Sequence, residues 1–177
     1  MTKKNILLLL ISAIFIILYF YRKEISYEIY RKVNIISAGS YPYAEIYNFK
    51  HSETEVKKAL NKFKSLHPEY KVPNSVGGIQ LADHQTENPS FWYISYFYFK
   101  DENEVIYTFT RENGKSETIF GLVGVEKIET NYWKNINDDF TYNENRKQIE
   151  KFEKRIFKVL NNILKENKSV ENKDLIK

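Results

Sequence analysis

The first feature of the chain is a continuous apolar segment at its N-terminus. Residues 6–20 read ILLLLISAIFIILYF, with Ser12 as the single polar side chain. A helix over residues 5–21 would be about 25 Å long at a rise of about 1.5 Å per residue. That length meets the lower limit of about 17 residues for crossing the hydrocarbon layer. We therefore predict a single-pass transmembrane helix whose partner is the lipid bilayer.

Lysines precede this run, and aromatic and basic residues stand at its C-terminal end, where they suit the headgroup layers. The predicted interface residues are Lys3, Lys4, Tyr19, Tyr21, Arg22 and Lys23. A cleaved secretory signal is the main alternative, but it needs small residues just after the apolar core. The bulky sequence YFYRK follows instead, and a lipoprotein would need a cysteine that the chain lacks. These features favour an uncleaved anchor.

The orientation of the anchor rests on two opposed arguments. The positive-inside rule counts Arg22, Lys23, Arg31 and Lys32 after the run against two lysines before it, which favours a cytoplasmic body. Export of a four-residue N-terminus is unusual, however, and long domains cross largely regardless of charge. We expect the N-terminus inside and the body outside, in a bacterial inner membrane.

After the run, the apolar pattern changes period and predicts three regions. Residues 1–36 form the anchor with a helical stalk, because Ile25, Ile29 and Val33 recur every four residues. The SAGSYP sequence at 37–42 marks a break. An α+β domain follows over residues 37–168, and residues 169–177 form a polar tail that we expect to fray.

Alternation and turn residues predict the strands of that domain. Residues 44–49 read as a short strand, and residues 69–90 as a loop with one short strand at 78–82. Residues 91–99, 104–111 and 116–125 predict a central antiparallel meander over 91–125, with a type I′ turn at Asn113-Gly114. A fourth strand over residues 126–130 is expected to continue the meander.

Two amphipathic helices complete the pattern. The first begins after Ser52, which forms a capping box with Glu55, and ends before Pro68. The second covers residues 143–167 with one apolar stripe, and its lysines, Lys151 among them, are expected in solvent. The predicted fold class is α+β: a transmembrane helix, then a small antiparallel sheet of three to five strands packed by two helices, the longer one C-terminal.

Composition narrows the functional classes. The chain has no cysteine, which excludes disulfides, thiolate metal sites and cysteine nucleophiles. The net charge is +4, but Lys3 and Lys4 supply two of these charges, so the remaining +2 does not indicate a nucleic-acid-binding protein. No motif for a nucleotide, metal or cofactor occurs, and we expect no cofactor.

The strand at 91–99 is the strongest candidate for a binding surface. Side chains alternate along a strand, so Trp92, Tyr96 and Tyr98 point to one face and Phe97 and Phe99 to the other. Two helices cover one face of a simple sheet, which leaves the first set for a protein partner. The alternative is that residues 69–90 and 126–142 cover this face as a second layer.

Two polar clusters are weaker candidates. Asp83, His84 and Glu87 could serve a membrane-tethered hydrolase, although a solvated loop explains them as well. Asp138 and Asp139, together with Glu144, suit the dipole of the last helix. The sequence thus favours a non-catalytic protein-binding or accessory module, such as an envelope-complex subunit or an immunity-type inhibitor. Oligomerisation through the last helix is a third hypothesis.

Overall fold

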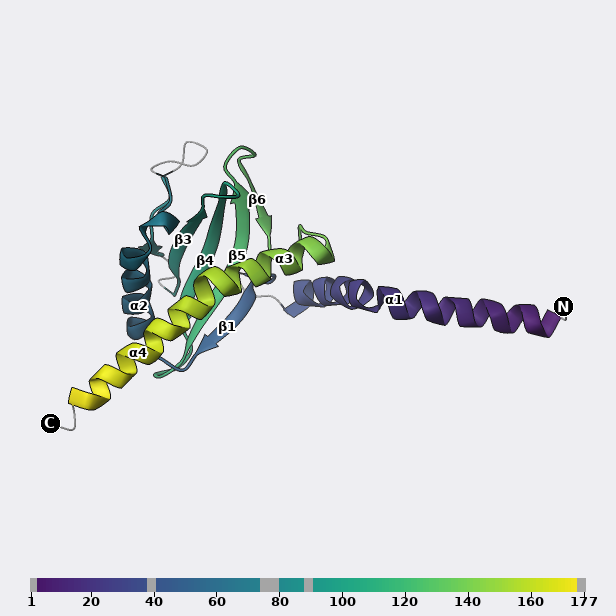
Figure 1. Ribbon diagram of the computed structural model, residues 1–177, viewed down its shortest axis with the longest axis horizontal. Helices are drawn as coiled ribbons and strands as arrows, with labels where there is room; N and C mark the ends of the chain where they lie inside the picture. Colours follow the sequence, from purple (N-terminus) through teal and green to yellow (C-terminus); the bar gives the residue numbers. More distant parts are fainter. Residues whose placement is uncertain (1–2, 38–40, 74–79, 88–90, 175–177) are drawn as a thin grey trace. The chain divides into compact units, whose positions relative to one another are not determined.

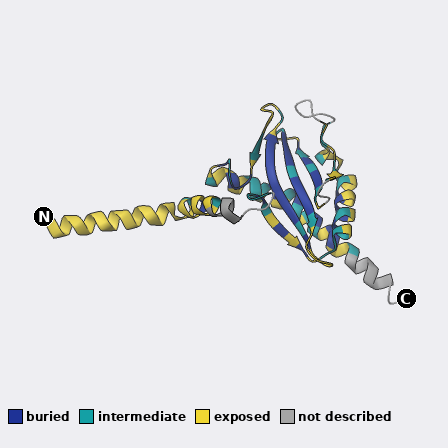
Figure 2. Ribbon diagram, turned by 180° about the vertical axis from the view of Figure 1, so that it is seen from behind, coloured by how far each residue is buried: buried dark blue, intermediate teal, exposed yellow. Residues whose placement is uncertain are grey.

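The computed structural model describes residues 3–37, 41–73, 80–87 and 91–174, and the chain divides into two units, Met1–Pro42 and Tyr43–Lys177. The first unit contains helix α1 (Lys3–Ser37), which extends the apolar run through the predicted stalk. Its segment Lys3–Lys32 is long and apolar enough to cross a membrane, and residues 6–21, which contain the apolar run, are exposed (Figure 2). The expected single hydrophobic helix is therefore present.

The second unit, called the body below, is an antiparallel sheet with helices packed on one face (Figure 1). The strands follow the order β1-β5-β4-β3-β2. Strand β1 pairs with residues 118–122 of β5, and β6 pairs with residues 124–127 of the same strand. This arrangement confirms the predicted α+β class, with six strands in the described body when the two-residue β2 is counted. Their bounds are β1 Glu45–Phe49, β2 His84–Gln85, β3 Tyr93–Phe99, β4 Glu104–Glu112, β5 Thr118–Lys127 and β6 Tyr132–Asn135.

The helices begin at reciprocal caps. Helix α2 (Glu53–Leu66) starts at the predicted capping box, in which the Glu55 carboxylate accepts a 2.7 Å hydrogen bond from the Ser52 backbone N–H. The last helical segment starts at a second box that sequence reasoning missed, formed by Thr141 and Glu144. It runs continuously through α3 (Tyr142–Phe152), the π-helical segment η2 (Glu153–Phe157) and α4 (Lys158–Asp174). A short 3₁₀ turn, η1 (Pro68–Tyr70), follows α2.

The hydrophobic core lies between the helices and one face of the sheet. Phe97 and Phe99 of β3 point into it, as the alternation predicted, and the stripes of α2 and of the last helix close it from the other side. Burial of these apolar side chains is the main force that holds the body together. The largest fully buried side chains are Phe63, Phe97, Phe99, Phe120, Phe152, Leu60, Ile106, Leu122, Ile136, Ile156, Leu160 and Leu164.

Several predicted elements need correction. The strand expected at 78–82 falls partly outside the described residues, residues 80–82 are not extended into the sheet, and β2 lies at His84–Gln85 instead. Strand β5 continues to Lys127, so the fourth strand of the meander is β6 at 132–135 and not 126–130. The hairpin after β4 is not type I′, because Gly114 has a positive φ of 83° whereas Asn113 does not. The Asn113 backbone N–H donates a 2.9 Å hydrogen bond to the Glu117 carbonyl oxygen. The loop that this bond closes is longer than the two-residue turn that was predicted.

The last helix also differs from its prediction. It continues to Asp174, past the expected end at residue 167. Lys151 does not lie in solvent: its ammonium group contacts the buried Glu104 carboxylate at the start of β4. The π-helical turn carries Arg155, which donates bidentate hydrogen bonds of 2.7 and 2.8 Å to Asp101 and thereby lowers the pKa of that carboxyl group. The ion pairs Lys151–Glu104 and Arg155–Asp101 thus hold the last helix against the β3–β4 turn.

Candidate functional site: the aromatic face of the sheet

The second face of the sheet points away from helices α2, α3 and α4. Figure 2, seen from behind, shows the strands of the body with none of these three helices across them. The β3–β4 pairing places Tyr96 opposite Tyr107 and Tyr98 opposite Val105 on this face. The structure therefore places Trp92, Tyr96 and Tyr98 as expected, and each of the three is half-buried.

Aromatic side chains from β3 and the residue before it, from β4 and from β6 lie on this face. The rings of Tyr96 and Tyr107 stack with centroids 5.4 Å apart, and the Trp133 ring meets Tyr107 edge-on at 5.6 Å. We call Trp92, Tyr96, Tyr98, Tyr107 and Trp133 the aromatic face. Such rings offer a large apolar area together with a hydroxyl or an indole N–H, which is the composition typical of binding surfaces.

Trp92 occupies the other end of this face. Its ring packs edge-on against buried Phe109 at 4.7 Å, and the Arg111 guanidinium lies 5.0 Å from its centroid. Two glycines of β5 make room for this layer. A Cβ atom at Gly121 would lie 2.3 Å from the Phe109 ring, and one at Gly124 would lie 2.8 Å from the Lys134 carbonyl oxygen. The absence of a side chain at Gly124 therefore allows β6, which carries Trp133, to approach β5 closely.

A largely buried acid lies beside Trp133 on this face. Glu126 of β5 is paired with Val105 on β4 and with Trp133 on β6, so its side chain points to the second face. Only 4% of its surface is exposed. Within the described part of the chain, its carboxyl group accepts no hydrogen bond and forms no ion pair, and burial raises its pKa.

The alternative that other segments cover the second face holds only in part. Trp133, from the region 126–142, lies against Tyr107 and within 6.3 Å of the Tyr96 ring centroid. It joins the aromatic layer and leaves Tyr96 and Tyr98 half-buried. The region predicted as a cover thus supplies a member of the surface.

The Asp83, His84 and Glu87 cluster does not converge. The Asp83 carboxylate accepts hydrogen bonds from Lys64 at 2.6 Å and from the Tyr96 backbone N–H at 3.0 Å, so it links α2 to the edge of β3. His84 is exposed and contacts the Ala82 carbonyl oxygen at 2.9 Å, and Glu87 is exposed. Among the described residues, no group of three or more metal-ligating side chains gathers here or elsewhere.

The acidic group near the last helix has local structural roles. Asp139 accepts a 2.7 Å hydrogen bond from the Asn135 backbone N–H and so closes the turn after β6. Glu144 caps α3, and its hydrogen bonds from Thr141 lower its pKa. Glu144 thus stabilises the start of α3, as predicted, whereas Asp139 stabilises the turn that precedes it.

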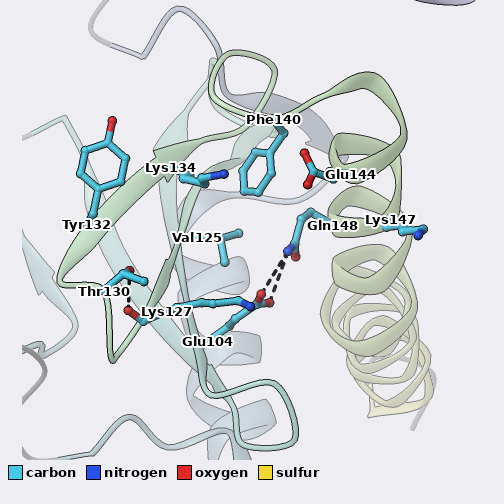
Figure 3. A pocket seen from close by; sticks show the side chains of 10 residues that line it. All are labelled: Glu104, Val125, Lys127, Thr130, Tyr132, Lys134, Phe140, Glu144, Lys147 and Gln148. Atoms are coloured by element: carbon cyan, nitrogen blue, oxygen red, sulfur yellow. Dashed lines mark hydrogen bonds between the residues drawn. The ribbon is translucent and has the colours of Figure 1, made fainter.

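A cavity of about 400 Å³ lies between α3 and strands β5 and β6 (Figure 3). Val125 and Phe140 form apolar parts of its wall, and the Lys134 ammonium lies 5.0 Å from the Phe140 ring centroid. Gln148 donates to the Glu104 carboxylate at 3.2 Å, while Lys147 extends outward at the rim. Three lysines and two glutamates line the cavity, so neither sign of charge dominates it. The lining residues are Glu104, Val125, Lys127, Thr130, Tyr132, Lys134, Phe140, Glu144, Lys147 and Gln148.

Comparison with protein-family models, with curated proteins and with solved structures gives no match for this chain. The site is therefore defined by its own geometry. Sequence reasoning missed three of its residues, namely Tyr107, Glu126 and Trp133. Tyr107 could have been found from the alternation of the second strand, but Glu126 and Trp133 lie in the region whose strand bounds were predicted incorrectly.

Proposed function

We propose that this chain is a membrane-anchored, non-catalytic binding module whose aromatic face receives a protein partner. The observation that carries the proposal is the presence of half-buried tryptophan and tyrosine side chains on a sheet face that lies away from the body helices. Tyr and Trp are enriched at the energetic centres of protein interfaces, because they bury much area with few rotatable bonds. An envelope-complex subunit or an immunity-type inhibitor would use such a surface.

The location proposed for this module follows from α1. The helix provides one segment with the length and composition of a membrane span, bordered by Lys3 and Lys4 on one side and by Arg22 and Lys23 on the other. We place it in a bacterial inner membrane with the body outside the cytoplasm, since long domains cross the membrane largely regardless of the flanking charge. On this proposal, the partner is another protein of the envelope or a ligand arriving from outside.

A hydrolase remains the rival proposal, and the site geometry favours the binding module over it. A hydrolytic site at Asp83 would need a carboxylate free to act on a substrate or on a histidine. Asp83 instead pairs with Lys64. Burial lowers the pKa of the Lys64 ammonium group, and the nearby Asp83 carboxylate opposes that effect. His84 and Glu87 lie in solvent beside it, without the convergence that a catalytic pair requires.

The proposal predicts that the aromatic face holds the chain in a larger assembly. In native membranes solubilised in mild detergent, the wild-type chain is expected to migrate well above the position of a single 21.2 kDa chain in its micelle. The double variant Tyr98→Ser/Trp133→Ser is expected to migrate as the free chain. Loss of one interface anchor commonly weakens binding by about 2 kcal/mol or more, so loss of two disrupts an assembly of moderate affinity. Native gel electrophoresis measures the shift.

The matched control is Leu66→Ser/Tyr132→Ser. These apolar side chains are 58% and 59% exposed, and neither belongs to the aromatic face, although Tyr132 is adjacent to Trp133 in sequence. The control is expected to keep the large assembly. An assembly that survives in the Tyr98/Trp133 variant, or that disappears equally in the control, would contradict the proposal.

A further inference from the structure

We infer that the partner inserts a positively charged side chain, a lysine or an arginine, between the rings of the aromatic face, where it pairs with Glu126. This inference rests on the proposed function and adds the chemistry of the group that the face recognises. It comes from the coincidence of two features in one place, a largely buried glutamate without a partner among the described residues and a set of electron-rich ring faces.

The position of Glu126 fits this role. Trp133 is directly opposite it on β6, and Val105, opposite it on β4, is itself paired with Tyr98. On the second face the acid thus has Trp133 on one side and Val105 on the other, with Tyr98 one strand further away. The faces of Trp and Tyr rings attract cations through their quadrupoles. A cation that reaches Glu126 would therefore gain a charge pair and ring contacts together.

The cations of the neighbouring strands do not fill this role. Lys127 is adjacent to Glu126 in the strand and points to the opposite face, where it lines the cavity beside α3. Lys134 is adjacent to Trp133 and lies over the Phe140 ring on that same opposite side. Arg111 lies over Trp92 at the other end of the aromatic face. The charge of Glu126 therefore remains uncompensated within the described body.

A structural role alone does not account for an acid at this position. Burial of the Glu126 side chain disfavours its charged form, a cost that an apolar side chain packed against Val105 and Trp133 would not carry. The raised pKa of Glu126 reports the same desolvation. Groups with perturbed ionisation tend to lie at functional sites, and this one lies on the face already proposed to bind.

An organic cation fits this site better than a metal ion. Metal ions need several converging oxygen or nitrogen ligands, and Glu126 is a single carboxylate with tyrosine and tryptophan around it. The described residues contain no cluster of three or more metal-ligating side chains. Guanidinium and ammonium groups on a flexible stem can pass between rings and bring their own apolar methylenes to the face.

The test titrates the full-length chain in detergent micelles with N-acetyl-L-arginine amide, a cation with peptide-like ends. In a Trp92→Phe background, Trp133 is the remaining tryptophan and reports binding by its fluorescence. A saturable change with a Kd on the order of 1–10 mM is expected for one such contact. Glu126→Gln is expected to weaken it at least tenfold, and uncharged N-acetyl-L-glutamine amide is expected to give no saturable change.

Two further variants make the result specific. Glu117→Gln removes an exposed acid in the loop before β5, away from Glu126, and is expected to keep the Kd within about twofold. Glu126→Leu provides a second charge-free variant that packs without an unpaired polar group. An unchanged Kd in both Glu126 variants, or no saturable response in the wild-type chain, would overturn the inference.

The native assembly separates this inference from the proposed function. If Glu126→Gln keeps the large assembly while Tyr98→Ser/Trp133→Ser loses it, the aromatic face binds a partner but the cation inference is wrong. If both variants lose the assembly and the control keeps it, the inference is supported. If the Tyr98/Trp133 variant keeps the assembly, the proposed function itself fails.

Discussion

The chain with Phe63→Ala is expected to lose about 3–5 kcal/mol of the free energy of unfolding of its body, because truncation of a buried phenylalanine leaves a cavity. Phe63 is fully buried on α2, and its ring meets the Phe97 ring edge-on at 5.7 Å and the Tyr70 ring at 5.5 Å. It therefore joins the helix layer to β3. Because the stability of a whole domain is about 5–15 kcal/mol, this one change removes a large share of it.

Urea unfolding at a constant detergent concentration, followed by the fluorescence of Trp92 and Trp133, measures this loss. Both tryptophans lie on the second face, so they report unfolding of the sheet and not a local change at α2. Leu66→Ala on the same helix is the control, since Leu66 is 58% exposed and is expected to change the stability by less than about 0.5 kcal/mol. A loss below about 1 kcal/mol at Phe63 would contradict the packing described.

The second large effect is expected at the membrane. The pair Leu10→Lys/Phe15→Lys should shift the protein from the membrane fraction to the soluble fraction. The run from Ile6 to Phe20 holds five Leu, five Ile and two Phe residues, which favour insertion by roughly 4–7 kcal/mol at about 0.3–0.6 kcal/mol each. Two lysines near the helix centre cost roughly 5–7 kcal/mol, which cancels that gain. Fractionation after carbonate extraction measures the distribution.

The control for this prediction is Ile25→Lys, which lies on α1 beyond the predicted span 5–21 and is expected to leave the protein in the membrane. A double variant that stays membrane-bound would show that the body attaches by other means. Reporters fused after Lys177 then give the side of the membrane: activity of an exported reporter is expected, and activity of a cytoplasmic reporter alone would place the body inside.

Local signals predicted the parts of the fold that local physics determines. The Ser52–Glu55 capping box, the apolar stripe of α2 and the alternation that separates Phe97 and Phe99 from Tyr96 and Tyr98 were all readable from the sequence. Each depends on residues within a few positions of one another. The corresponding predictions are confirmed for the elements at 45–66 and 93–112.

Features that depend on pairing between distant segments were missed. The bounds of β5 and β6 follow from their partners, since Gly124 has to accept the β6 backbone beside it. Without the correct strand bounds, neither the opposition of Glu126 to Trp133 nor the burial of that acid could be predicted. Lys151 was placed in solvent for the same reason, because its partner Glu104 is 47 residues away in the chain. Tertiary context decided these positions.

The most direct test of the central claim, that the second face of the sheet meets a protein partner, is photo-crosslinking in intact cells. A benzoylphenylalanine residue is introduced in place of Tyr98 on the aromatic face, and in a separate strain in place of Leu66 on the exposed side of α2. The proposal predicts one discrete ultraviolet-dependent adduct from position 98 and none from position 66. Adducts from position 66 alone, the same adducts from both positions, or no adduct at position 98 would contradict it.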